Sequence, residues 1–210
     1  MNKITAINAQ QKNRSRVSIF LDDEYAFSLT KFTAAWLKIG QELTQEKIAD
    51  LKAKDGNEVL LQKAINFINY RPRSEKETRL RLRKYGCDLE QEDNVITRLI
   101  STKLLDDVKF AEIWVENRSE FRPRSKYLLR IELYKKGISD EIIDDALKNI
   151  IDEDLAIRAA KQQARKYQML EWKDFRKKLI AFLSRRGFSY SVIQGLAKNI
   201  WEEMNSPTYQ

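Results

Sequence analysis

The side chains in this sequence that most clearly point to a binding function are arginines and lysines that recur at a fixed interval. Residues 70–74 read YRPRS, and residues 121–125, 51 positions later, read FRPRS. Each motif leads into a basic amphipathic segment, RLRLRKYG or RIELYKKG, that ends at a glycine. Cationic side chains repeated along a chain suit a phosphate backbone better than a small ligand. The spacing therefore predicts recognition of an extended acidic partner.

The candidate contacts for a nucleic acid are the basic residues of these two segments and of a third, more divergent one. They are Arg71, Arg73, Arg79, Arg83, Lys84, Arg122, Arg124, Lys126, Arg130, Lys135, Lys136, Lys177, Lys178, Arg185 and Arg186. Residues 71–84 and 122–136 each carry a net charge of +5, and residues 165–186 carry +6, whereas the whole chain carries +8. If the units stack, the second helix of each unit contributes to a positive stripe.

Two features of these segments allow a second interpretation. The arginines of the two motifs precede helix starts, whose free N–H groups favour anions, but they could instead pair with acidic residues of the neighbouring unit. Four aromatic side chains could stack on exposed bases, but their helical spacing favours a place in the core. These four are Tyr70, Trp114, Phe121 and Trp172.

The residue types argue against catalysis. The chain has no histidine, which excludes histidine-dependent triads and histidine-ligated metals, and its single cysteine, Cys87, cannot form an internal disulfide or a cysteine-rich zinc site. The acidic pairs at 22–23, 106–107 and 144–145 fit turns, helix starts and solvated faces. No glycine-rich phosphate loop or nucleophile motif is present. We expect neither an enzyme nor a metal or other cofactor.

Composition indicates a folded chain. Of the 210 residues, 42% are hydrophobic and 33% are charged, so a core can form, and the length suits one or two domains or a short array. No apolar stretch approaches the roughly 18 residues of a membrane span, and the N-terminus lacks the apolar region of a signal peptide. With a single cysteine, these features predict a cytoplasmic protein without a membrane partner, and we expect a monomer.

A tandem repeat organises the chain. Gly86, Gly137 and Gly187 are separated by 51 and 50 residues, and each follows a basic helical segment. The third copy is degenerate, with Trp172 at the position of Arg122. Repeats of this length stack and bury their apolar faces on one another. The predicted divisions are an N-terminal β element at 1–30, a helical connector at 31–56, repeats at 57–101, 102–150 and 151–203, and a tail at 204–210.

Helix signals divide each repeat into three helices. In the second repeat, Asp106 and Asp107 can cap a first helix, Pro123 ends it, Ser125 starts a second helix, and Gly137 ends that one in a left-handed conformation. The third helix follows over 138–150. In the first repeat, the serine and glutamate of S-x-x-E at 74–77 form a capping box. In the third repeat we expect helices over 156–167, 175–186 and 190–201.

The first 30 residues follow a β pattern instead. Two short β-rich runs, 16–21 and 25–29, flank the acidic turn at 22–24 and predict a hairpin, with 4–7 as a third strand. The turn lacks the Asn-Gly or Asp-Gly pair that would define its type. After Thr30 the pattern is helical to the end. The predicted fold is mainly α: three tandem three-helix repeats in an elongated array behind a small β element.

Residues 103–138, KLLDDVKFAEIWVENRSEFRPRSKYLLRIELYKKGI, resemble the central signature of the RecX family. That signature pairs Leu-Asp-Asp-x-x-Phe-Ala with a downstream aromatic, an arginine, a basic segment and Leu-x-x-Lys-Gly; residues 105–107, 110–111, Trp114, Arg118, Arg124 and 133–137 match it. Residues 69–86 resemble the equivalent segment of the first repeat. The likeness extends over about residues 57–201 and is weakest in the third repeat.

The resemblance implies a non-enzymatic regulator of the recombinase RecA in recombination, DNA repair and the SOS response. Family members bind the RecA filament on single-stranded DNA, lie in its helical groove and typically inhibit its ATPase and strand exchange, and some bind DNA directly. No catalytic residues carry over from the family. Two alternatives stay open: a helical DNA- or RNA-binding array unrelated to RecA, and a purely protein-binding scaffold.

Overall fold

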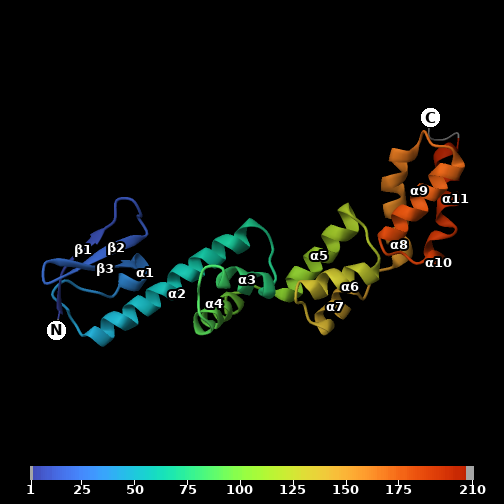
Figure 1. Ribbon diagram of the computed structural model, residues 1–210. Coiled ribbons are helices and arrows are strands. Elements are labelled where there is room, and N and C mark those ends of the chain that lie inside the picture. The colour runs from blue at the N-terminus through green and yellow to red at the C-terminus, as the bar shows by residue number, and fades with distance from the viewer. Residues whose placement is uncertain (1, 207–210) are drawn as a thin grey trace. The chain divides into compact units, whose positions relative to one another are not determined.

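The computed structural model describes residues 2–206 (Figure 1). The chain divides into two compact units: residues up to Arg71 together with Glu77–Leu105, and Pro72–Lys76 together with the residues from Asp106 onward. Within the described residues, no helix is long and apolar enough to cross a membrane. The first unit contains the small sheet and three longer helices, and the second unit is helical.

The N-terminal sheet has four antiparallel strands in the order β3-β2-β1-β4. The strands are β1 (Asn2–Ala9), β2 (Arg16–Leu21), β3 (Glu24–Thr30) and β4 (Glu42–Leu43). Asp22 and Asp23 both have positive φ, of 50° and 71°, as a two-residue type I′ hairpin loop requires. Alternate residues of β2 are buried, so one face of the sheet contributes to the core. The predicted hairpin and third strand are therefore confirmed.

One expectation for residues after Thr30 is wrong. The segment is not helical throughout, because Asn2 and Lys3 of β1 pair with Leu43 and Glu42 of β4. Two residues are too few to show a strand period in the sequence. After the short α1 (Lys31–Ala34), α2 (Gln45–Tyr70) continues from the predicted connector into the predicted first repeat. Nothing interrupts this helix until Pro72, ahead of which Arg71 is extended.

The remaining helices form three groups. With the second half of α2, the first group contains α3 (Glu75–Arg83) and α4 (Leu89–Ser101). The second contains α5 (Asp107–Phe121), α6 (Lys126–Lys135) and α7 (Asp140–Leu147). The third contains α8 (Asp152–Ala164), η1 (Arg165–Tyr167), α9 (Trp172–Arg185), α10 (Tyr190–Ile193) and α11 (Leu196–Asn205). The mainly helical prediction is confirmed, but the last predicted helix, 190–201, is interrupted after Ile193. Residues 207–210 of the predicted tail lie outside the described residues.

Several of the expected helix signals have the predicted role. Asp106 caps α5 by accepting a hydrogen bond from the N–H of Lys109, and Ser125 caps α6 by accepting one from the N–H of Leu128. The three repeat glycines all have positive φ, between 80° and 85°. They therefore end their helices as left-handed caps, a conformation that residues with a Cβ rarely adopt.

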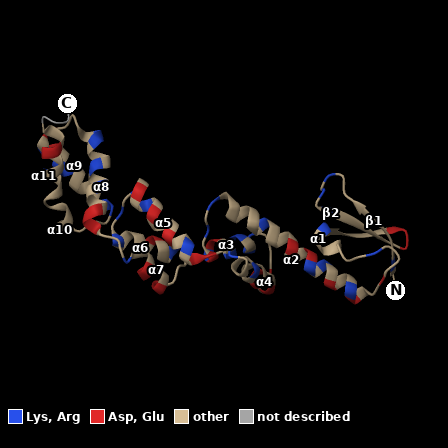
Figure 2. Ribbon diagram, turned by 180° about the vertical axis from the view of Figure 1, so that it is seen from behind, with Lys and Arg blue, Asp and Glu red and all other residues tan. Residues whose placement is uncertain are grey.

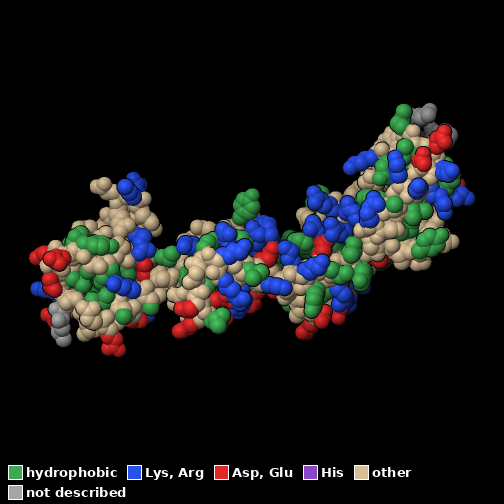
Figure 3. All heavy atoms as spheres, in the orientation of Figure 1, with side chains coloured by type: hydrophobic (Ala, Val, Ile, Leu, Met, Phe, Trp, Pro, Cys, Tyr) green, Lys and Arg blue, Asp and Glu red, His purple; other side chains and the backbone are tan. Residues whose placement is uncertain are grey.

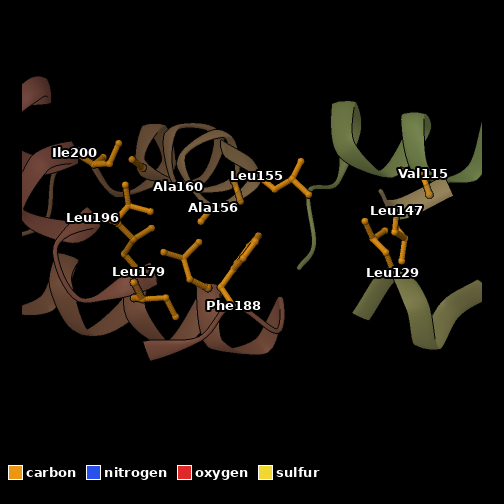
Figure 4. Close-up of a cluster of buried hydrophobic side chains, with 14 of the residues drawn as sticks. Val115, Leu129, Leu147, Leu155, Ala156, Ala160, Leu179, Phe188, Leu196 and Ile200 are labelled. Carbon is orange, nitrogen blue, oxygen red and sulfur yellow. The ribbon is translucent and has the colours of Figure 1, made fainter. Parts of the chain in front are cut away.

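Each unit has its own apolar core. In the first unit, one cluster joins the sheet to α1 and the start of α2, and a second joins the rest of α2 to α3 and α4. In the second unit, one cluster extends from α5 to α11. Figure 4 shows Val115, Leu129 and Leu147 of its α5–α7 part and seven labelled side chains of its part after α7. These cores hold the basic helices in place.

Candidate basic interface

The second unit contains a carboxylate that three donors share. Glu132 of α6 accepts hydrogen bonds from the indole Nε1 of Trp114 at 2.9 Å and from Nε of Arg118 at 2.9 Å, both on α5. It also accepts one from Arg124, in the loop between these helices. Trp114 and Arg118 are one helical turn apart, so they lie on the same face of α5. Glu132 thus fixes two arginines on the surface of the α5–α6 pair.

Four arginines gather here, and we call Arg118, Arg122, Arg124 and Arg186 the arginine cluster. Arg186, at the end of α9, donates from Nη1 to the carbonyl oxygen of Pro123 at 3.3 Å. Burial lowers the pKa of Arg186, and the charges of the other three arginines lower it further, whereas Glu132 raises it. The cations outnumber the one neighbouring carboxylate, so an anion bound at this place would relieve their mutual repulsion.

Arg122 is the member of the cluster most available to a partner. Its side chain is exposed, and it forms no ion pair with any residue between 2 and 206. Figure 2 shows the Lys and Arg positions on the ribbon, and Figure 3 shows their side chains gathered on one face over α5, α6 and α9. The second unit therefore presents an unneutralised basic surface built from its two three-helix groups.

The ring of Trp114 packs between the core and this basic surface. It stacks on Phe110 with the ring centroids 5.7 Å apart, and Phe110 is buried. The Arg118 guanidinium lies 4.3 Å from the Trp114 ring centre, and Nζ of Lys136 lies 5.0 Å from it. A cation over an indole face is held in place by the ring quadrupole. Trp114 thus belongs to the core, as its spacing favoured, and also orients two cations.

The basic residues of the first unit have a different environment. Glu92 of α4 is 1% exposed and accepts hydrogen bonds from Arg79 at 3.0 Å and from Arg83 at 2.7 Å. The hydrogen bond from Arg83 is the largest cause of a lowered pKa of Glu92. Arg79 also pairs with Asp93 at 2.6 Å, and Arg71 pairs with Glu77 at 3.0 Å. Acidic side chains of the same unit therefore neutralise several of the predicted contacts here.

The serines of the two RPRS motifs have a structural role. Ser74 and Ser125 are both fully buried. The Ser74 hydroxyl donates to the carbonyl oxygen of Lys136 at 2.7 Å, and the N–H of Ser125 donates to the carbonyl oxygen of Arg186 at 3.0 Å. Both acceptors lie directly before a left-handed glycine, Gly137 or Gly187. Each motif therefore docks on the turn that ends the second helix of the following repeat.

At each helix start behind these motifs, one N–H already has an intramolecular carboxylate acceptor. The N–H of Glu75 donates to a carboxylate oxygen of Asp107 at 2.8 Å, and the N–H of Lys126 donates to one of Asp152 at 2.6 Å. An external anion would have to displace these carboxylates. Anion binding by the arginines of the two motifs stays a prediction.

The other predicted contacts lie on helix surfaces. Arg130 of α6 pairs with Asp140 and Asp144 of α7, and Lys126 and Lys136 are half-buried. Those that are exposed are Lys84, Lys135, Lys177, Lys178 and Arg185. Arg73 is half-buried in the segment that joins the second unit. All of them stay predicted contacts for a partner.

Two of the four aromatic residues contradict the core interpretation. Tyr70 is 86% exposed and Phe121 is 70% exposed, each at the last position of its helix, α2 or α5. Trp172, in contrast, is 37% exposed and packs on Phe175 and Trp201. Helical spacing therefore did not predict the exposure of Tyr70 and Phe121.

Two residues that organise the arginine cluster were missing from the predicted contacts. Arg118 lies four residues after Trp114, and Glu132 is the single acidic residue between 122 and 136. An isolated carboxylate inside a basic run was the signal that could have identified its role. Cys87, by contrast, is half-buried, and burial raises the pKa of its thiol, which agrees with an inert residue.

Models of known families match four parts of the chain. Residues 2–44 match the model described as the regulatory protein RecX N-terminal domain. Residues 61–99, 106–147 and 151–195 match the first, second and third three-helix domains of RecX. Together the matches extend over most of the chain and coincide with the sheet and the three helical groups.

Known proteins with similar sequences and structures carry the same name. The chain is 32% identical to the regulatory protein RecX of Listeria innocua over 97% of this chain and 77% of that protein. It is 33% identical to the regulatory protein RecX of Bacillus pumilus over 92% and 75%. A crystal structure of regulatory protein RecX matches with a TM-score of 0.74 at 26% identity, over 94% of this chain and all of that one. RecX from Lactobacillus salivarius matches with a TM-score of 0.58 at 25% identity, over 70% and 97%.

Proposed function

Because the chain belongs to the RecX family of regulatory proteins, we propose that it is a non-enzymatic regulator that binds the RecA filament on single-stranded DNA and lowers its activity. Its place of action is the bacterial cytoplasm, where RecA assembles. The arginine cluster is the observation that carries this proposal beyond the family name. It offers a filament the excess positive charge that a DNA backbone or an acidic protein face requires.

The cluster suits regulation by binding rather than by reaction. Its cations come from α5, the loop before α6 and the end of α9, and Glu132 holds two of them in place. Such a surface recognises charge over an extended area and contains no acid–base pair of the kind that catalysis needs. Because Arg122 has no ion pair within the described residues, it favours direct contact with single-stranded DNA. A scaffold that binds only proteins is the less favoured function.

An ATPase assay tests the proposal. Addition of the full chain to its cognate RecA on single-stranded DNA is expected to lower the ATPase rate at near-stoichiometric or lower ratios. The variant Arg122→Glu should inhibit less than the native chain. Lys148→Glu, an equal charge change at an exposed site at the end of α7 and outside the cluster, should inhibit as the native chain does.

Two outcomes would contradict the proposal. An ATPase rate that stays constant over a wide range of ratios, with strand exchange also unchanged, would favour a DNA-binding function unrelated to RecA. If Arg122→Glu and Lys148→Glu lose inhibition of the ATPase equally, net charge and not the arginine cluster accounts for the inhibition. Titration of bare single-stranded DNA with the same variants separates contact with the DNA from contact with RecA.

A further inference from the structure

The two copies of the aromatic-RPRS motif keep five equivalent positions, and the fold accounts for two of them in both copies. Proline ends the first helix of each repeat, and the buried serine docks on a glycine turn. Arg71 pairs with Glu77, and Arg124 pairs with Glu132. The proline and the serine therefore have intramolecular tasks in both copies, whereas of the equivalent pair Arg71 and Arg122 only Arg71 forms an ion pair within residues 2–206.

The aromatic position has no such task. Tyr70 and Phe121 are 86% and 70% exposed, and within residues 2–206 neither ring contacts another aromatic ring or a cation. Burial of such a ring contributes roughly 1.5–3 kcal/mol, and neither repeat gains it in this structure. Two equivalent large rings left in water therefore indicate a ligand that covers them.

The surroundings of each ring identify the chemistry of that ligand. The sequence neighbours are polar, Asn69 and Arg71 at the first ring and Glu120 and Arg122 at the second. A protein hot spot would have an apolar surround, whereas here a flat apolar face stands alone beside a cation. Single-stranded nucleic acid matches this pattern because each nucleotide offers a flat base and a phosphate. Paired bases in a duplex are already stacked and offer neither ring a free face.

We propose that Tyr70 and Phe121 are base-stacking residues that each bind one unpaired base of single-stranded DNA, with Arg122 near the phosphate at the second ring. The inference rests on the proposed function, in which the chain meets single-stranded DNA, and names the groups that recognise it. Stacking on unpaired bases would make the surface bind single strands in preference to duplex. Each ring binds its base within its own unit, and the proposal requires no contact between the two units.

Fluorescence anisotropy with three labelled probes tests this. The probes are an oligothymidylate of about 20 nucleotides, an abasic strand of the same length and charge, and a duplex. Tyr70→Ala and Phe121→Ala should each weaken oligothymidylate binding about fivefold or more, because stacking contributes at least ~1 kcal/mol per base. Binding to the abasic strand should be unchanged by either substitution, because it has no base to stack.

Matched variants exclude simpler explanations. Tyr134→Ala removes a ring of α6 that is also exposed, at 67%, but outside the motif, and it should bind all three probes as the native chain does. Phe121→Tyr keeps a stacking face and should retain affinity. Thermal unfolding of each alanine variant should occur at the native temperature, since neither ring is buried.

Three results would overturn the inference. In the first, both alanine variants bind oligothymidylate as the native chain does; in the second, they lose equal affinity for the abasic strand. In the third, the variants keep DNA binding but lose inhibition of RecA, which would assign the rings to a protein surface. If the native chain inhibits the RecA ATPase but binds no bare single strand, the stacking inference fails while the proposed function stands.

Discussion

The first three-helix domain and the second unit carry the same basic motif but use it differently. In the first, the buried carboxylate of Glu92 accepts from Arg79 and Arg83, and these arginines hold α3 against α4. In the second, Glu132 accepts from Arg118 and Arg124, but Arg122 and Arg186 form no ion pair within residues 2–206. Equal net charge along the sequence therefore does not imply equal charge available to a partner.

The two regions also differ in what covers the glycine turns. A Cβ at Gly187 would lie 2.5 Å from both Leu128 and Ser125, and one at Gly137 would lie 2.7 Å from Lys76, whereas one at Gly86 would meet nothing within 4 Å. The second and third turns receive an RPRS segment, and the first does not. The motif is therefore a docking element first, and its partner-binding residues are those that docking leaves exposed.

The largest expected effect comes from alanine at these turns. Gly86→Ala places a Cβ at positive φ and should lower the free energy of unfolding by about 1–2 kcal/mol. Gly187→Ala adds a steric clash to the same strain and should cost about 2–5 kcal/mol. Denaturant unfolding of the two variants measures the difference, and equal losses would contradict the docking role.

The next effect concerns acid stability. Hydrogen bonds from Arg83 and Arg79 hold the pKa of Glu92 below its ordinary value, so folding favours its charged form. This stabilisation is complete above the unfolded-state pKa of about 4.3 and is lost as the pH falls through the lower pKa of the folded state. Glu92→Gln should cost about 1–3 kcal/mol at neutral pH and less at low pH. A loss in Glu92→Gln that stays the same across the acid range would mean that the carboxylate is not the titrating group.

The smallest effect separates the two equivalent arginines, Arg71 and Arg122. Arg122→Ala should leave the melting temperature unchanged and lower the salt dependence of single-strand binding by about 0.7 in log–log slope, the value of one phosphate contact. Arg71→Ala breaks its ion pair with Glu77, so it should cost ~0–1 kcal/mol and change the slope less. Salt titrations and melting curves of both variants measure this, and equal slopes would show that the two regions bind alike.

Local signals in the sequence determined much of this protein. The helix caps at Asp106 and Ser125, the left-handed glycines, the β hairpin and the repeat of 51 residues all depend on residues close together in the chain. Their energies come from backbone conformation and neighbouring hydrogen bonds, which short segments specify by themselves. The family signature is likewise a set of local spacings.

Only the tertiary structure decided which basic and aromatic side chains are free. Whether Arg79 is neutralised depends on Glu92, 13 residues away on another helix, and the arginine cluster needs Arg186 beside Pro123, 63 residues away. The same holds for Tyr70 and Phe121, whose helical spacing suggested the core. Charge pairing and burial depend on distances in space, because these interactions weaken over a few ångströms. Residue order alone does not contain those distances.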